Sequence, residues 1–155
     1  MTPSSPGRLL AIDHGRKVLG LAVCDSTGLL ASPLRRLQRR SRRQDFAAIA
    51  AIVREVGAAE ILVGVPLPPP GHEGYSQADT VRLWASRLAA AVDVPVRLWN
   101  EALSSEEAAR LLTDAGREGT GRHDEIAAAV ILQSYLDSLR EGFAVPPAVA
   151  PAQGE

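Results

Sequence analysis

Short apolar runs at the start of the chain, separated by polar residues, predict strands joined by tight turns. Residues 8–12 are mostly apolar and are followed by Asp-His-Gly at residues 13–15, which predicts a strand that runs into a turn. A second apolar run covers residues 18–24, and the short gap between the two runs predicts an antiparallel hairpin. Residues 29–37 form a third candidate strand, where Pro33 favours a sheet edge or a bulge because proline cannot donate a ladder hydrogen bond.

The pattern changes after residue 43, where segments with helical spacing alternate with further strands. Residues 60–65 form a continuous apolar run, as in a strand buried on both faces, and residues 95–99 form a shorter strand. Apolar spacing and capping residues predict helices at residues 44–56, 76–92, 104–113 and 124–139. Strands that are joined through a helix are expected to pair in parallel.

Hairpin strands followed by strand–helix–strand units predict an α/β fold, with a mixed five-stranded sheet and helices on both of its faces. This order resembles that of ribonuclease-H-like domains. One such domain is expected at residues 8–142, after a flexible start at residues 1–7. The tail at residues 143–155 is rich in Pro and Ala, and this composition predicts disorder.

The overall composition is that of a globular protein, with 46% hydrophobic and 23% charged residues in a chain of 155. The single cysteine excludes an intrachain disulfide, and no apolar segment reaches the roughly 18 residues that a membrane span needs. Because the start of the sequence has no leader-like apolar segment, the protein is expected in the cytoplasm.

The net charge of -1 conceals a basic N-terminal part. Residues 1–44 hold nine Lys and Arg residues against two acids, which suggests a face that attracts polyanions. Arginine contacts to phosphates would bind nucleic acid with strong salt dependence and little sequence specificity. The other interpretation of these charges is a solvated loop or helix start. The candidate nucleic-acid-binding residues are Arg16, Lys17, Arg35, Arg36, Arg39, Arg40, Arg42 and Arg43.

Three carboxylates stand at the ends of predicted elements. Asp13 ends the first strand, Glu101 follows the strand at residues 95–99, and Asp124 begins the last helix. Taken singly, Asp13 is explained by a solvated strand end and Asp124 by helix capping. The carboxyl ends of parallel strands meet at one sheet edge, so together the three could bind hard divalent cations. Two such ions, Mg²⁺ or Mn²⁺, about 4 Å apart can activate a water in phosphodiester cleavage.

Three sequence motifs, in this order, resemble those of one family. They are Ala-Ile-Asp-His-Gly-Arg-Lys-Val-Leu-Gly-Leu-Ala-Val-Cys-Asp at residues 11–25, Val-Gly-Val-Pro-Leu at residues 63–67 and Asp-Glu-Ile-Ala-Ala-Ala at residues 124–129. The chain is similar, over residues 9–139, to the YqgF/RuvX-like family of Holliday-junction-resolvase-like proteins and pre-16S rRNA nucleases. The resemblance implies a ribonuclease-H-like fold and divalent-metal catalysis, with the family's triad falling on Asp13, Glu101 and Asp124.

Two positions depart from the family's pattern. Asn100-Glu101-Ala102 stands where the family has Asp-Glu-Arg, which keeps the glutamate and loses an acid and an arginine. Val18 replaces the usual arginine of the first motif. The metal ligands survive, so catalysis is still expected, and Arg16 or the cluster at residues 35–43 remains for substrate positioning.

The resemblance implies a hydrolase, a metal-dependent endonuclease that processes precursor 16S rRNA in ribosome biogenesis. Two alternatives stay open: a Holliday junction resolvase that acts on branched DNA in recombination and repair, and a non-catalytic nucleic-acid-binding protein. A resolvase that cuts symmetric strands would need a two-fold homodimer, so the oligomeric state bears on this choice.

Overall fold

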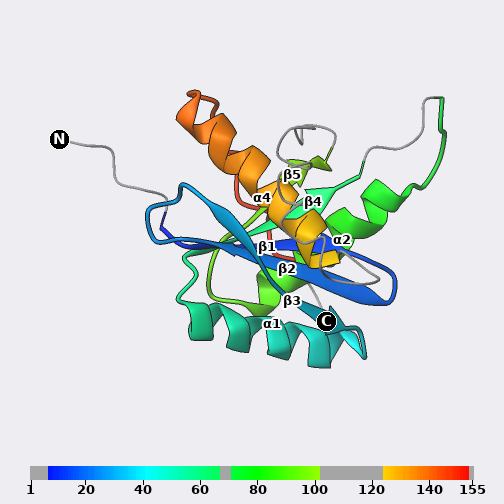
Figure 1. Cartoon of the computed structure of the whole chain (residues 1–155). Helices are drawn as coiled ribbons and strands as arrows, with labels where there is room; N and C mark the ends of the chain where they lie inside the picture. Colours follow the sequence, from blue (N-terminus) through cyan, green and yellow to red (C-terminus); the bar gives the residue numbers. More distant parts are fainter. Residues whose placement is uncertain (1–6, 67–70, 102–123, 154–155) are drawn as a thin grey trace.

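The computed structural model describes residues 7–66, 71–101 and 124–153 of the chain. Within these residues, five strands form one sheet in the order β3-β2-β1-β4-β5 (Figure 1). The strands are β1 (Leu9–His14), β2 (Val18–Cys24), β3 (Ala31–Gln38), β4 (Glu60–Val65) and β5 (Val96–Asn100). β2 is antiparallel to both β1 and β3, whereas β1, β4 and β5 run parallel. The predicted mixed five-stranded sheet is confirmed.

The edge strand β3 carries the proline that the sequence assigned to an edge or a bulge. Pro33 lies opposite Ala22, and the pairing of β2 with β3 shifts register between Leu21 and Ala22. Both the predicted edge position and the predicted bulge are therefore present. Each of them suits proline, which has no backbone N–H to donate to a neighbouring strand.

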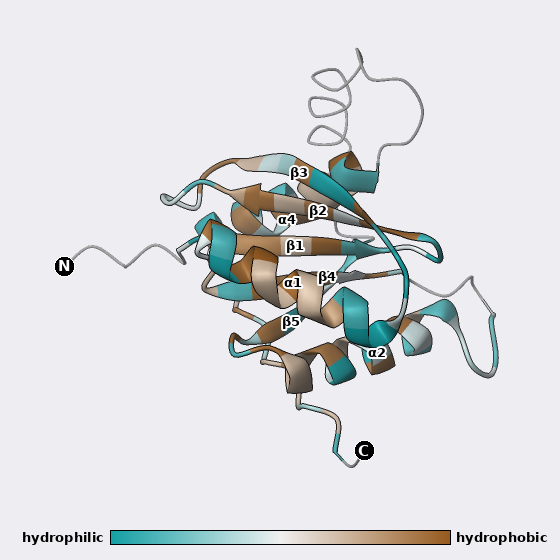
Figure 2. Cartoon of the chain, turned by 90° about the horizontal axis from the view of Figure 1, so that it is seen from below, coloured by the Kyte–Doolittle hydropathy of each residue, from teal (hydrophilic) through white to brown (hydrophobic). Residues whose placement is uncertain are grey.

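Helices cover both faces of the sheet, as predicted. The helices in the described residues are α1 (Arg42–Val56), α2 (Gln77–Ala91) and α4 (Asp124–Arg140). α1 and α2 lie on one face and α4 lies on the other (Figure 1, Figure 2). The helix expected at 104–113, and residues 1–6 of the expected flexible start, lie outside the described residues. None of the helices described is both long and apolar enough to cross a membrane.

The alternation of side chains along β1 divides the apolar core into two layers. Leu10 and Ile12 are buried beneath α1 and α2, whereas Leu9 and Ala11 are buried beneath α4. By the same alternation, Asp13 belongs to the face that α4 covers. The carboxylate is therefore directed toward the layer that also holds the first turn of α4.

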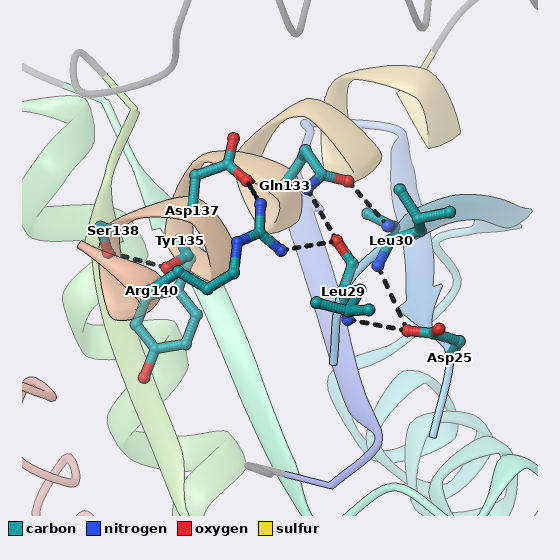
Figure 3. A network of polar contacts seen from close by, with 9 residues as sticks. Asp25, Leu29, Leu30, Gln133, Tyr135, Asp137, Ser138 and Arg140 are labelled. Carbon is teal, nitrogen blue, oxygen red and sulfur yellow. Dashed lines mark hydrogen bonds and ion pairs between the residues drawn. The ribbon is translucent and has the colours of Figure 1, made fainter. Parts of the chain in front are cut away.

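Polar contacts fasten the C-terminal half of α4 to the turn between β2 and β3 (Figure 3). The Gln133 side chain accepts a hydrogen bond from the Ala31 amide at 2.9 Å and donates one to the Leu29 carbonyl at 3.0 Å. Arg140 donates to the same carbonyl at 3.1 Å. Together with the apolar contacts beneath the helix, these bonds fix the axis of α4 and hence the place of its first residue, Asp124.

The C-terminal segment, whose composition predicts disorder at residues 143–155, contacts the rest of the protein up to Ala152. The Val149 amide donates to the Val96 carbonyl at 2.7 Å, and the Ala152 amide donates to the Ser86 carbonyl at 2.9 Å. The segment thereby occupies the outer edge of β5, whose backbone groups require partners. Composition misses this, because the partners lie some fifty residues earlier in the chain.

Candidate active site

Asp13 lies between two glycines on the neighbouring strands. It pairs with Gly20 of β2 on one side and with Gly64 of β4 on the other. Residues opposite one another in a sheet direct their side chains to the same face, so two side chains are missing beside the Asp13 carboxylate. The space that they would fill is taken by residues from two other parts of the chain.

Glu101 occupies the space above Gly64. A Cβ atom at Gly64 would lie 3.1 Å from both Cγ and Oε1 of Glu101, and 2.6 Å from Cδ1 of Ile131 in α4. Glu101 follows the last residue of β5 directly, so the parallel pairing of β1, β4 and β5 brings it to the same end of the sheet as Asp13. There the side chains of Glu101 and Asp13 share a hydrogen bond.

Asp124 is held above Gly20, on the other side of Asp13. A Cβ atom at Gly20 would lie only 1.9 Å from the backbone oxygen of Asp124, so the first residue of α4 rests directly on the glycine. The Oδ2 atom of Asp124 is buried and has no hydrogen-bond partner among the described residues. A buried, unpartnered carboxylate oxygen is unfavourable unless a cation or a donor meets it.

The surroundings of Asp13 and Glu101 favour their protonated forms. Burial, together with the hydrogen bond to Asp13 and the charge of Asp13, raises the pKa of Glu101 to about 7, and burial is the largest of these causes. Burial also raises the pKa of Asp13, as does the charge of Asp124, while the hydrogen bond from Glu101 acts in the opposite sense. The pair therefore shares a proton, with Glu101 as the donor, which a divalent cation would displace.

The three predicted carboxylates are thus brought to one end of the sheet, and two of them are in direct contact. Across the residues described, no three His, Cys, Asp or Glu side chains are already arranged around a common metal position. Mg²⁺ does not require such a cage, because it commonly binds through one or two carboxylates with water and substrate phosphates. The donor set and the unpartnered oxygen of Asp124 fit an ion of this kind.

His14, which follows Asp13, lies on the opposite face of the sheet. Its ring packs edge-on against Trp84 of α2, with 4.8 Å between the ring centroids. Burial, and to a lesser extent the positive charge of Arg39, lower the pKa of His14 to about 4. His14 is therefore a neutral core residue of the α1/α2 layer.

The predicted basic residues surround the turn between β1 and β2, close to the carboxylates. A hollow of about 770 Å³ is lined by Arg16 and Lys17 of this turn and by Asp124. Further along the chain, Arg35 and Arg36 belong to β3, Arg39 and Arg40 to the connection that leads into α1, and Arg42 and Arg43 to the first turn of α1. The basic set and the acidic set therefore meet at the β1–β2 turn.

The roles of Gly20 and Gly64 were missed when the sequence alone was considered. A signal was present, because an isolated glycine within a strand often marks a close approach of another part of the chain. Both glycines lie within predicted strands, but only the register shows that they flank Asp13.

Comparisons with known proteins agree with this geometry. The sequence profile of the RuvX family, described as "Holliday junction resolvase", matches residues 7–138. A protein of Syntrophus aciditrophicus named "Putative pre-16S rRNA nuclease" is 41% identical over 86% of this chain and 91% of its own length. A protein of the same name from Anaeromyxobacter sp. (strain Fw109-5) is 45% identical over 84% of this chain and 96% of its own length.

Solved structures show the same fold at low sequence identity. RuvC of T. thermophilus, solved in complex with a Holliday junction substrate, has a TM-score of 0.66 and 18% identity. The match covers 91% of this chain and 99% of that one. This likeness confirms the predicted ribonuclease-H-like fold. With a profile that spans most of its length and relatives above 40% identity, the chain belongs to the RuvX family.

Proposed function

We propose that the protein is a divalent-metal-dependent nuclease that hydrolyses phosphodiester bonds in structured nucleic acid, with precursor 16S rRNA as its substrate. The observation that carries the proposal is the group of Asp13, Glu101 and Asp124 around two strand glycines. The names of the similar proteins support the choice of rRNA. Such a substrate would place the reaction in the cytoplasm.

Asp13 and Glu101 would hold the metal, and Asp124 would complete its surroundings. Bound Mg²⁺ or Mn²⁺, as one ion or two, supplies a Lewis acid that stabilises the negative charge developing on the phosphate oxygens. The chain's own part begins with the loss of the proton that Glu101 shares with Asp13, which leaves both carboxylates charged. Asp124, fixed by α4 above Gly20, adds a third negative charge at the same place.

A cleavage assay with the purified protein tests the proposal. Wild type, incubated with Mg²⁺ or Mn²⁺, should cut a precursor 16S rRNA fragment, and Asp13→Asn and Glu101→Gln should lose at least about 100-fold in rate. Asp93→Asn is the matched control, because it removes the same charge from an exposed turn before β5. Wild type that cuts no nucleic acid, or Asp13→Asn that cuts as fast, would refute the proposal.

A Holliday junction resolvase is the second candidate, because the matching family carries that description. The same carboxylates would serve, since the metal chemistry needs no 2′-hydroxyl group. Preferential cutting of a four-way DNA junction at symmetric positions, together with a dimer in sedimentation analysis, would select this candidate. Cutting of the rRNA fragment by a monomer would exclude it.

A further inference from the structure

The basic residues near the active site differ in how their charges are engaged. Arg35 of β3 pairs with Glu55 of α1 at 2.6 Å. Its neighbour Arg36 pairs with Glu125 of α4 at 3.4 Å. Both guanidinium groups therefore already face a carboxylate, and a phosphate would have to compete for them.

A second group of cations lines a hollow of about 380 Å³ between the β1–β2 turn and the connection from β3 to α1. The residues of its lining are Arg16, Lys17, Gln38, Arg39, Arg40, Arg42 and Asp45. Figure 2 shows that this turn and this connection lie at the same end of the sheet. In the part of the chain that the structure describes, neither Lys17 nor Arg40 is paired with a carboxylate.

The carboxylate in this lining, Asp45, is engaged from within the protein. Asp45 is only 3% exposed, accepts a hydrogen bond from the Arg40 amide at 2.9 Å and lies 3.7 Å from Nε of Arg39. Arg39 also donates to the Gly15 carbonyl at 2.9 Å. Arg39 therefore ties the turn that carries Lys17 to the connection that carries Arg40.

This arrangement holds several cations beside one hollow, and Lys17 and Arg40 are among those that have no carboxylate partner within the described residues. Like charges held close together repel one another, and the repulsion is relieved when an anion lies between them. A phosphodiester group provides such an anion, and its oxygens accept charge-assisted hydrogen bonds from both lysine and arginine.

Lys17 connects this hollow with the active site. It also lines the hollow of about 770 Å³ to which Asp124 contributes. A phosphate bound between Lys17 and Arg40 would thus neighbour the carboxylates without being the phosphate whose bond is cleaved.

We propose that the hollow is a phosphate subsite that binds a backbone phosphodiester flanking the cleaved bond, with Lys17 and Arg40 as its cationic ligands. The inference rests on the proposed function, because it takes the bound strand to be the strand that is cut. Arg39 acts as a positioning residue that fixes the distance between the two ligands, and Arg35 stands outside the subsite.

The test is the salt dependence of binding, measured by fluorescence anisotropy on fluorescein-labelled 20-nucleotide RNA and DNA strands. Asp13→Asn with Mg²⁺ is the parent protein, and wild type in EDTA repeats the measurement should that variant be unstable. Lys17→Gln and Arg40→Gln should each weaken binding about three- to ten-fold at 0.1 M salt and lower the salt slope by about one. RNA and DNA should respond alike, because the phosphate is common to both.

Arg54→Gln is the matched control, because it removes the same charge near the far end of α1. It lies about 18 Å along the helix from Arg42, and binding should change less than about two-fold. Equal losses on Arg40→Gln, Arg35→Gln and Arg54→Gln would overturn the subsite and leave the proposed function standing. Failure of the parent protein to bind either strand, with no cleavage by wild type, would overturn both.

Discussion

Gly64 of β4 leaves the space in which Ile131 of α4 meets the sheet beside the active site. A Cβ atom at Gly64 would lie 2.6 Å from Cδ1 of Ile131, whereas ordinary van der Waals contacts begin at 3.4 Å. In Gly64→Ala the Ile131 side chain would therefore have to move away by 0.8 Å. Ile131 is only 4% exposed and belongs to the apolar layer between α4 and the sheet. Overpacking of this kind lowers the free energy of unfolding by about 1–3 kcal/mol.

Ile131→Val removes the clashing methyl group and by itself costs about 0.5–1.5 kcal/mol. The double variant should be no less stable than Gly64→Ala alone, so the coupling energy should reach about 1 kcal/mol or more. Urea unfolding of the four proteins gives this value. Stability losses that add within about 0.5 kcal/mol would refute the packing argument.

Activity should respond differently from stability in the same four proteins. The new Cβ atom would still lie 3.1 Å from Cγ and Oε1 of Glu101, whichever residue stands at position 131. The second substitution should therefore relieve the clash with the helix without restoring cleavage. Full recovery of cleavage in the double variant would show that Gly64 serves the helix and has no part in placing the carboxylate.

Three further predictions follow from the same contacts. Gly20→Ala would place a Cβ atom 1.9 Å from the backbone oxygen of Asp124, so single-turnover cleavage should fall about 100-fold, and a loss below about three-fold would contradict the close approach. Asp45→Ala leaves the Arg39 guanidinium without its carboxylate partner, and urea unfolding should show a loss of about 2–4 kcal/mol, with a smaller loss for Asp45→Asn. The raised pKa of Glu101 means that the folded, metal-free protein binds more protons than the unfolded chain between pH 4.5 and about 7. Stability in EDTA should therefore fall as the pH rises through this window, and the fall should be smaller in Glu101→Gln; an identical pH dependence of the melting temperature in both would contradict the shared proton.

The hydrophobic pattern was sufficient to predict the sheet, because the central strands β1, β2 and β4 are buried through apolar residues that lie close together in sequence. The apolar run of β4 is typical of a doubly buried strand, and β4 is indeed buried between the α1/α2 layer and the α4 layer. The last helix, expected at residues 124–139, is found as Asp124–Arg140. These elements depend on local spacing, which a single sequence displays directly.

Features that depend on distant partners could not be predicted in this way. The Val149 amide of the C-terminal segment donates to the Val96 carbonyl, and nothing in the Pro- and Ala-rich composition of the segment indicates that contact. The arginine cluster looked uniform in sequence, yet Arg35 is paired with Glu55 whereas Arg40 has no paired carboxylate among the described residues. In both cases the deciding partner comes from another element of the fold.

The three carboxylates depend partly on local sequence pattern and partly on contacts between distant parts of the chain. Strand ends and the start of a helix placed them correctly along the chain, and the parallel order of β1, β4 and β5 predicted that Asp13 and Glu101 would meet. The glycines that make room for this meeting became visible only with the register. Gly20 and Gly64 lie directly opposite Asp13 on the neighbouring strands, and a Cβ atom at either position would collide with residues of the site or of α4.

Binding of Mn²⁺ is the measurement that tests the central claim most directly. Electron paramagnetic resonance follows free Mn²⁺ as the purified protein is added, without any need for a substrate. Wild type should bind the ion, Asp13→Asn and Glu101→Gln should lose at least about ten-fold in affinity, and Asp93→Asn should match wild type. Equal Mn²⁺ affinity in all four proteins would contradict the assignment of Asp13 and Glu101 as metal ligands.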